Sequence, residues 1–172
     1  MPGPAPEFSP AEALCTCCGL CCDGTLFAEA PLLTAEVEEA QRVGLRVLAR
    51  PDGRHAFRQP CAALSDCTCR IYAERPRVCR TFHCALLSAL SADEVGLDEA
   101  RALVDRVKAV AARLTAAIGD ASAREQSDVP LKLRVMNRFG PRGAAGMPPD
   151  VAQDLEKLDG LLRLYFRWQR DS

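Results

Sequence analysis

The 172-residue sequence lacks an excess of positive charge, a targeting segment and a membrane span. Its 22 Lys and Arg residues against 23 Asp and Glu residues give a formal charge of -1. Proteins that hold nucleic acid through general phosphate contacts usually carry a basic excess, so there is no strong nucleic-acid signal. The N-terminus has no basic or apolar signal region, and no run reaches about 18 uncharged apolar residues. We therefore expect no membrane partner and a cytoplasmic location.

The motifs of several common enzyme classes are also missing. The sequence has no Gly-rich phosphate loop, no His-Glu-x-x-His and no Gly-x-Ser-x-Gly. Ordinary nucleotide-dependent, zinc-protease and hydrolase mechanisms therefore have no residues to carry them. Whether the chain is an enzyme stays open at this point.

Cysteine is the unusually frequent residue, at 10 of 172 positions. In a reducing cytoplasm, cysteines at this density are more often metal ligands or catalytic thiols than structural disulfides. The rest of the composition, 48% hydrophobic and 26% charged, is typical of a globular domain with a core. We therefore expect a metal ion to be the partner of the chain.

The pattern of apolar and turn residues predicts a mainly α fold with a small β-hairpin, of the α+β class. We expect one domain organised around a cysteine-ligated metal centre. It has a flexible Pro-rich leader (1–12), a cysteine-cluster metal-binding region (13–90) and a C-terminal helical region (91–172) packed on it.

The expected elements follow from apolar periodicity and from capping and turn residues. They are a short strand at 25–27, a helix capped by Thr34 and ended by Gly44, a hairpin of 45–49 with 55–57, a helix starting at Pro76, a long helix from Leu97 to Ile118 after a capping box at 91–94, a short helix at 131–138, and a last helix over 151–165.

The first cysteine block has the spacing Cys-x-x-Cys-x-x-Cys-Cys, at Cys15, Cys18, Cys21 and Cys22. Two intervening residues allow two thiolates to converge on one metal, as in zinc knuckles and ferredoxin loops. Adjacent side chains diverge, so we expect Cys21 and Cys22 to serve two different metals or opposite sides of a cluster. Further ligands then come from the second block, and the two blocks should converge.

Both blocks together resemble the YkgJ-like cysteine-cluster family, a zinc- or iron-chelating domain. Beside the first block, the resemblance rests on Pro60-Cys61, Cys69-Arg70-Ile71-Tyr72, Arg75-Pro76, Cys79-Arg80 and Cys84. It covers roughly residues 15–84 and implies chelation of zinc or iron without supplying a reaction. The eight cysteines that it implies as ligands are Cys15, Cys18, Cys21, Cys22, Cys61, Cys69, Cys79 and Cys84, which leaves Cys17 and Cys67 as additional thiols.

The second block is the basic segment of the chain, and its arginines suit a thiolate centre. A buried set of thiolates carries negative charge that nearby cations must offset. We expect Arg75 and Arg80 to lie beside the metal ligands, the alternative being solvated helix residues. His83, next to Cys84, is expected in a supporting or surface position, and His55 is expected to be exposed.

Three functions fit these observations. The first is a metal-binding protein that chelates iron, as an iron-sulfur cluster, or zinc through the eight cysteines. The second is a zinc-stapled protein-interaction module, and the third is an iron-sulfur enzyme related to lysine N-methylases, which share the cysteine box. Thiolates accept both metals, so the choice between zinc and iron stays open. Because residues 15–84 offer only short apolar runs, we also expect the metal to stabilise their fold.

Overall fold

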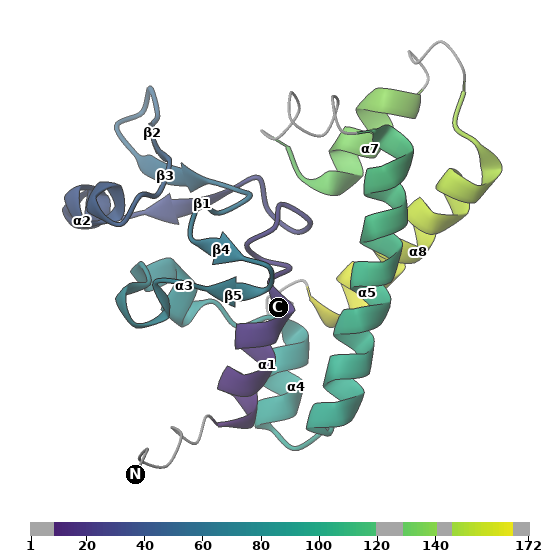
Figure 1. Cartoon of the computed structure of the whole chain (residues 1–172), viewed down its shortest axis with the longest axis horizontal. Coiled ribbons are helices and arrows are strands. Elements are labelled where there is room, and N and C mark those ends of the chain that lie inside the picture. The colour runs from purple at the N-terminus through teal and green to yellow at the C-terminus, as the bar shows by residue number, and fades with distance from the viewer. Residues whose placement is uncertain (1–8, 120–128, 141–145, 167–172) are drawn as a thin grey trace.

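A computed structural model describes residues 9–119, 129–140 and 146–166 of the chain. Figure 1 shows a small sheet with α2 on one side of the molecule and the helices α5, α7 and α8 on the other, with α1 and α4 beside them. The helices are α1 (Pro10–Cys18), α2 (Val37–Arg42), α3 (Arg77–Thr81), α4 (Ala85–Ser91), α5 (Leu97–Ile118), α7 (Leu131–Phe139) and α8 (Pro149–Tyr165).

The long helix α5 organises the helical part. Its apolar residues recur every three or four positions, and they are buried against α1, α7 and α8. The prediction of this helix from Leu97 to Ile118 is confirmed. The expected capping box at 91–94 does not form, because Leu90 is buried and α4 continues through Ser91, so Gly96 precedes α5 instead.

Nineteen buried residues from α1, α4, α5, α7, α8 and neighbouring turns form one large core. Leu14 and Leu20 from the first cysteine block belong to it, together with Leu86 and Leu87 of α4. The helices that carry or follow the cysteines are therefore packed on the C-terminal helices.

The N-terminal helix α1 begins at Pro10, inside the segment expected to be a leader. Ser9 and Glu12 form a capping box: the Ser9 hydroxyl accepts from the Glu12 amide at 3.3 Å, and the Ser9 amide donates to the Glu12 carboxylate at 3.0 Å. The rest of the expected leader, residues 1–8, lies outside the described residues.

The strands form two small antiparallel sheets. β1 (Glu29–Leu32), β2 (Val47–Ala49) and β3 (His55–Arg58) have the order β1-β3-β2, and β4 (Leu64–Ser65) pairs with β5 (Thr68–Cys69). The α+β class is thus confirmed, and the predicted hairpin is β2 with β3. The sequence did not predict that β1 would add a third strand or that β4 and β5 would pair.

The strand predicted at residues 25–27 is wrong. The Asp23 carboxylate accepts from the Thr25 amide at 2.8 Å, and the Leu26 amide donates to the Leu20 carbonyl at 3.3 Å. These bonds fold the segment into a loop, since an Asp side chain competes with regular pairing of the backbone. The strand β1 begins later, at Glu29.

A second, smaller core lies under the sheet. It contains five buried residues, Leu32, Ala40, Leu45, Phe57 and Ala63. The 3-10 turns η1 (Thr34–Glu36) and η2 (Tyr72–Glu74) flank this region, and α2 follows η1 directly, so the predicted helix ending at Gly44 is present in two pieces. Because this core is small, the sheet part depends on other contacts for its stability.

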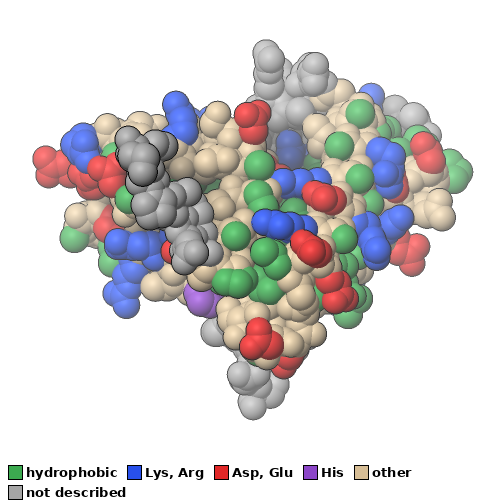
Figure 2. Space-filling view, turned by 60° about the horizontal axis from the view of Figure 1, so that its bottom comes forward, with side chains coloured by type: hydrophobic (Ala, Val, Ile, Leu, Met, Phe, Trp, Pro, Cys, Tyr) green, Lys and Arg blue, Asp and Glu red, His purple; other side chains and the backbone are tan. Residues whose placement is uncertain are grey.

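The surface shows no concentration of one charge on the face in Figure 2, where Lys and Arg side chains are interspersed with Asp and Glu side chains. None of the helices in the described ranges is both long enough and apolar enough to cross a membrane.

Candidate metal centre

The first cysteine block lies partly on α1 and partly on the turn that follows it. Cys15 and Cys18 are one helical turn apart and share a face of α1. The Cys17 thiol donates to the Ala13 carbonyl at 3.1 Å, within the same helix. The two expected ligands of α1 therefore have a common direction, which the thiol of Cys17 does not share.

Gly19 ends α1 and allows the chain to reverse. Its φ of 72° is in the left-handed region, where glycine is favoured. The Gly19 carbonyl accepts from the Cys22 amide at 2.8 Å, which closes a tight turn carrying Cys21 and Cys22. A Cβ at Gly19 would also lie 3.4 Å from Cα of Cys67. The glycine thus brings the first block against the β4–β5 hairpin.

Backbone pairing joins the second block to the first. The Cys61 amide donates to the Cys22 carbonyl at 2.7 Å, although the two residues are far apart in sequence. Cys69 lies on β5, where it pairs with Leu64, and β5 contacts α1. Cys79 lies on α3, and Cys84 precedes α4, where its sulfur accepts from the Leu87 amide at 3.4 Å.

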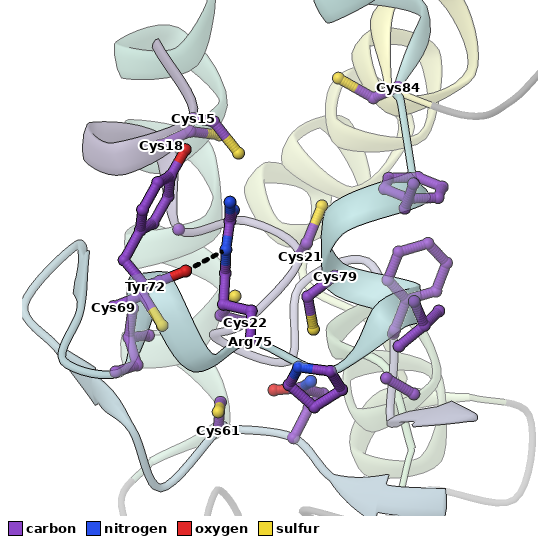
Figure 3. A pocket seen from close by; sticks show the side chains of 18 of the residues that line it. Cys15, Cys18, Cys21, Cys22, Cys61, Cys69, Tyr72, Arg75, Cys79 and Cys84 are labelled. Carbon is purple, nitrogen blue, oxygen red and sulfur yellow. Dashed lines mark hydrogen bonds between the residues drawn. The ribbon is translucent and has the colours of Figure 1, made fainter. Parts of the chain in front are cut away.

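All eight expected ligands line one cavity of about 620 Å³. Figure 3 shows their sulfur atoms around this space, with those of Cys15, Cys18, Cys21 and Cys84 in its upper part and those of Cys22, Cys61, Cys69 and Cys79 in its lower part. The expected convergence of the two blocks is confirmed. All ten cysteines are free thiols, so the cavity is not closed by disulfides.

The sulfur atoms surround the cavity and do not meet at one point. Within residues 9–119, 129–140 and 146–166, no group of three or more His, Cys, Asp or Glu side chains is arranged so that it could hold a metal ion. Four thiolates on one zinc ion, each at about 2.3 Å from it, must lie much closer together. The cavity is therefore wider than a single ion.

Burial raises the pKa values of most of these thiols. It raises that of Cys18 to about 12, with a further increase from Cys84, and it raises that of Cys79 to about 12, with a further increase from Cys61 and Cys69. Burial therefore favours the protonated form of Cys18 and Cys79 in the metal-free chain, and metal binding at these two thiols has to release protons.

The same electrostatic contacts show which thiols are neighbours in the lower part of the cavity. The pKa of Cys22 is raised by burial and then by Cys61, Cys79 and Cys69. Burial also raises the pKa of Cys61, and Cys69 raises it further. The pKa values of Cys22, Cys61 and Cys79 are thus each raised by other thiols of this lower set, and Cys15 also raises that of Cys22.

A second set of neighbours occupies the upper part. Burial raises the pKa of Cys21 well above its usual value, and smaller increases come, in decreasing order, from Cys18, Cys84, Cys22 and Cys15. Burial likewise raises the pKa of Cys84, and Cys15 is the thiol that adds to this. Adjacent residues Cys21 and Cys22 thus have different principal neighbours.

The two expected arginines are in different environments. Arg75 lines the cavity: its guanidinium carbon lies 3.4 Å from the centre of the Tyr72 ring, and its Nε donates to the Tyr72 carbonyl at 2.8 Å. Its positive charge opposes the rise that burial causes in the pKa of Cys15. Arg80, in contrast, is exposed on α3.

The two histidines lie away from the sulfurs of the cavity wall. His83 is exposed, as expected for a surface position. His55 is half-buried on β3 and its Nδ1 is buried without a hydrogen-bond partner among the described residues, so the expectation of an exposed side chain is wrong. It pairs in register with Leu32 and Ala49, and this sheet position accounts for its burial.

Two charged residues support the first block and were not expected from the sequence. The Lys108 ammonium of α5 donates to the Cys17 carbonyl at 2.7 Å, near the C-terminal end of α1 where a cation is favourable. Arg134 of α7 is buried, and burial lowers its pKa while the charge of Asp23 opposes this change. Both depend on contacts between distant segments, so no local pattern predicts them.

Comparison with known families gives an assignment for this arrangement. Residues 14–102 match the family model CxxCxxCC, described as a "Putative zinc- or iron-chelating domain". The chain belongs to this cysteine-cluster family. Its cavity wall holds both cysteine blocks of the matched region, and a zinc- or iron-chelating function follows for the chain. Neither the curated proteins nor the solved structures include a match.

Proposed function

We propose that this family member binds iron, as iron-sulfur clusters, through eight of the nine cysteines that line the cavity, the ninth being the additional thiol Cys67. The observation that carries the proposal is the arrangement of these sulfurs around a space of about 620 Å³. An iron-sulfur cluster contains several atoms, and each thiolate binds a different iron, so its ligands are farther apart than those of a single ion. A wide ring of thiols therefore suits a cluster better than it suits one zinc ion.

The donor set fits such a group. All eight donors are soft thiols, which favour iron-sulfur clusters and zinc over hard cations. Apolar side chains such as Leu14, Leu86 and Val104 complete the wall, and they limit access of water. A bound cluster would supply one-electron redox chemistry at this position.

The residues of the chain have separate tasks in this proposal. The cysteines lose their protons and hold the iron, while Arg75 places a positive charge beside the resulting thiolates. Gly19 shapes the turn that presents Cys21 and Cys22. Lys108 fixes the end of α1, and with it the direction of Cys18.

Anaerobic purification followed by iron, acid-labile sulfide and zinc analysis tests the proposal. We expect a coloured protein with iron and sulfide in about equal amounts and little zinc. The variant Cys17→Ser is the matched control, because its thiol bonds within α1. A colourless protein that contains zinc and no sulfide would contradict the iron-sulfur assignment and favour the zinc-stapled interaction module. The enzyme related to lysine N-methylases stays a prediction, which requires a substrate position beside the metal.

A further inference from the structure

We propose that the eight cysteines form two separate centres of four ligands each. The upper centre is held by Cys15, Cys18, Cys21 and Cys84, and the lower centre by Cys22, Cys61, Cys69 and Cys79. The inference rests on the proposed iron-sulfur binding, and it places one cluster in each group of four thiols.

The two hydrophobic cores divide five of the eight cysteines in this way. Cys18 and Cys84 pack against the large helical core. Cys61, Cys69 and Cys79 pack against the small core under the sheet. Since each core is a separate packing unit, thiols on different cores are fixed relative to different sets of side chains.

The lower centre brings together four segments around the sheet. The bond from the Cys61 amide to the Cys22 carbonyl fixes these two residues side by side. The Arg70 amide donates to the Ala63 carbonyl at 2.9 Å. This bond joins the end of β5, which carries Cys69, to the segment that follows Cys61. α3, which carries Cys79, contacts β1 of the three-stranded sheet. Each of the four thiols thus has a backbone fixed to the sheet region or to its neighbour.

The upper centre is built on two helices in contact. α1 carries Cys15 and Cys18 on one face, and it packs against α4, which Cys84 precedes. Figure 3 shows the sulfur of Cys21 on the side of Cys84, above the sulfurs of Cys22 and Cys79. Cys21 is therefore the fourth ligand of the upper centre, beside Cys15, Cys18 and Cys84.

The change from one centre to the other occurs between Cys21 and Cys22. Consecutive side chains diverge, and in Figure 3 the sulfur of Cys21 lies above that of Cys22 after the turn that Gly19 begins. Cys15 belongs to the upper group because it shares a face of α1 with Cys18, and Figure 3 shows it beside Cys18.

Charge is consistent with two centres in one cavity. Four thiolates are the usual ligand number for a zinc ion and for a four-iron cluster, and each such centre retains negative charge. In Figure 3 the guanidinium of Arg75 stands between the upper and lower sulfurs. Its charge acts on Cys15 of the upper group and on Cys79 of the lower group. Arg75 therefore reduces the repulsion between the two centres.

Metal stoichiometry of the full-length wild-type protein is the first test. Two centres predict about eight iron atoms and eight sulfides per chain for four-iron clusters, or about four of each with the Mössbauer spectrum of two-iron clusters. One four-iron cluster per chain, identified by Mössbauer spectroscopy, would overturn the inference and leave the proposed iron-sulfur binding intact. Absence of bound metal after anaerobic reconstitution would overturn both.

Paired substitutions are the second test, and they ask which cysteines act together. Cys18→Ser with Cys84→Ser removes two ligands of the upper centre, and it should halve the metal content. Cys61→Ser with Cys79→Ser should halve it through the lower centre, whereas Cys18→Ser with Cys79→Ser, one from each centre, should remove most of it. Equal losses in all three pairs would overturn the division into these two groups.

The amide protection of α5 is measured in each variant as a control for folding, and the wild-type stoichiometry decides the number of centres independently. The spare-thiol pair Cys17→Ser with Cys67→Ser is the matched control, and it should keep the full metal content.

Discussion

Loss of the lower metal centre should unfold the sheet part of the protein and leave the helical part folded. The perturbation is the pair Cys61→Ser with Cys79→Ser, which removes two thiols that pack against the small core. That core has three large buried side chains, Leu32, Leu45 and Phe57. Each contributes roughly 1.5–3 kcal/mol when it is fully buried, so together they contribute about 5–9 kcal/mol.

A four-thiolate metal site contributes on the order of 10 kcal/mol of apparent binding energy in small zinc domains. A metal bound at the lower centre would thus stabilise the sheet part by at least as much as its apolar core does. The large core is different, because its nineteen buried residues include none of the three side chains above and pack without the lower centre. We therefore expect the effect to be confined to about residues 29–82.

Hydrogen-deuterium exchange followed by mass spectrometry measures this effect segment by segment. If the local stability falls by about 5 kcal/mol, the amide hydrogens of the segment should exchange more than ~10³-fold faster, since every 1.4 kcal/mol is a factor of ten in the opening equilibrium. Peptides covering β1 and β3 should show this increase, whereas peptides covering α5 and α8 should keep their native protection.

The reasoning would be refuted if the variant, shown by analysis to have lost metal, kept native protection in β1 and β3. The sequence alone suggested a wider effect, over residues 15–84. The structure narrows the segment that is expected to unfold, because Leu14, Leu20 and Leu86 belong to the large core. The helices α1 and α4 should therefore stay folded.

Four further predictions concern single residues. Cys17→Ser and Cys67→Ser should each leave metal content within about a tenth of wild type by metal analysis, and loss of a full centre from either would show that the eight-ligand set is wrong. Arg75→Gln should make the reduction potential of an iron-sulfur centre more negative in anaerobic redox titration, since a cation beside the cluster stabilises its reduced form; an unchanged potential contradicts this role. Leu114→Ala, in the large core, should lower the free energy of unfolding by about 2–5 kcal/mol in urea titrations, and a loss under about 1 kcal/mol would be too small for a buried leucine. Asp159→Asn should cost about 1 kcal/mol at pH 7, because hydrogen bonds from a lysine and an arginine lower the pKa of this carboxylate; its stabilisation is present above the pKa of the unfolded chain and is lost as pH falls through the lower folded value, so the difference should vanish in acid.

The main elements were predictable where one local pattern determined them. The apolar repeat of α5 and the turn residues between β2 and β3 predicted both features, because helical periodicity and turn geometry depend on neighbours in sequence. The strand expected at residues 25–27 failed because a single side-chain bond from Asp23 competed with strand pairing. The short β4–β5 hairpin has too few residues to produce a recognisable pattern.

The sequence by itself determined that this is a cysteine-cluster protein, because the number, spacing and types of its cysteines are local properties that select thiolate-metal chemistry. Only the tertiary structure decided that the blocks surround a wide cavity, that Arg75 faces it while Arg80 is exposed, and that Cys21 and Cys22 have different neighbours. These properties depend on two cores packing from opposite sides and on a backbone bond between Cys61 and Cys22. Such contacts join distant segments, and spacing along the chain does not encode them.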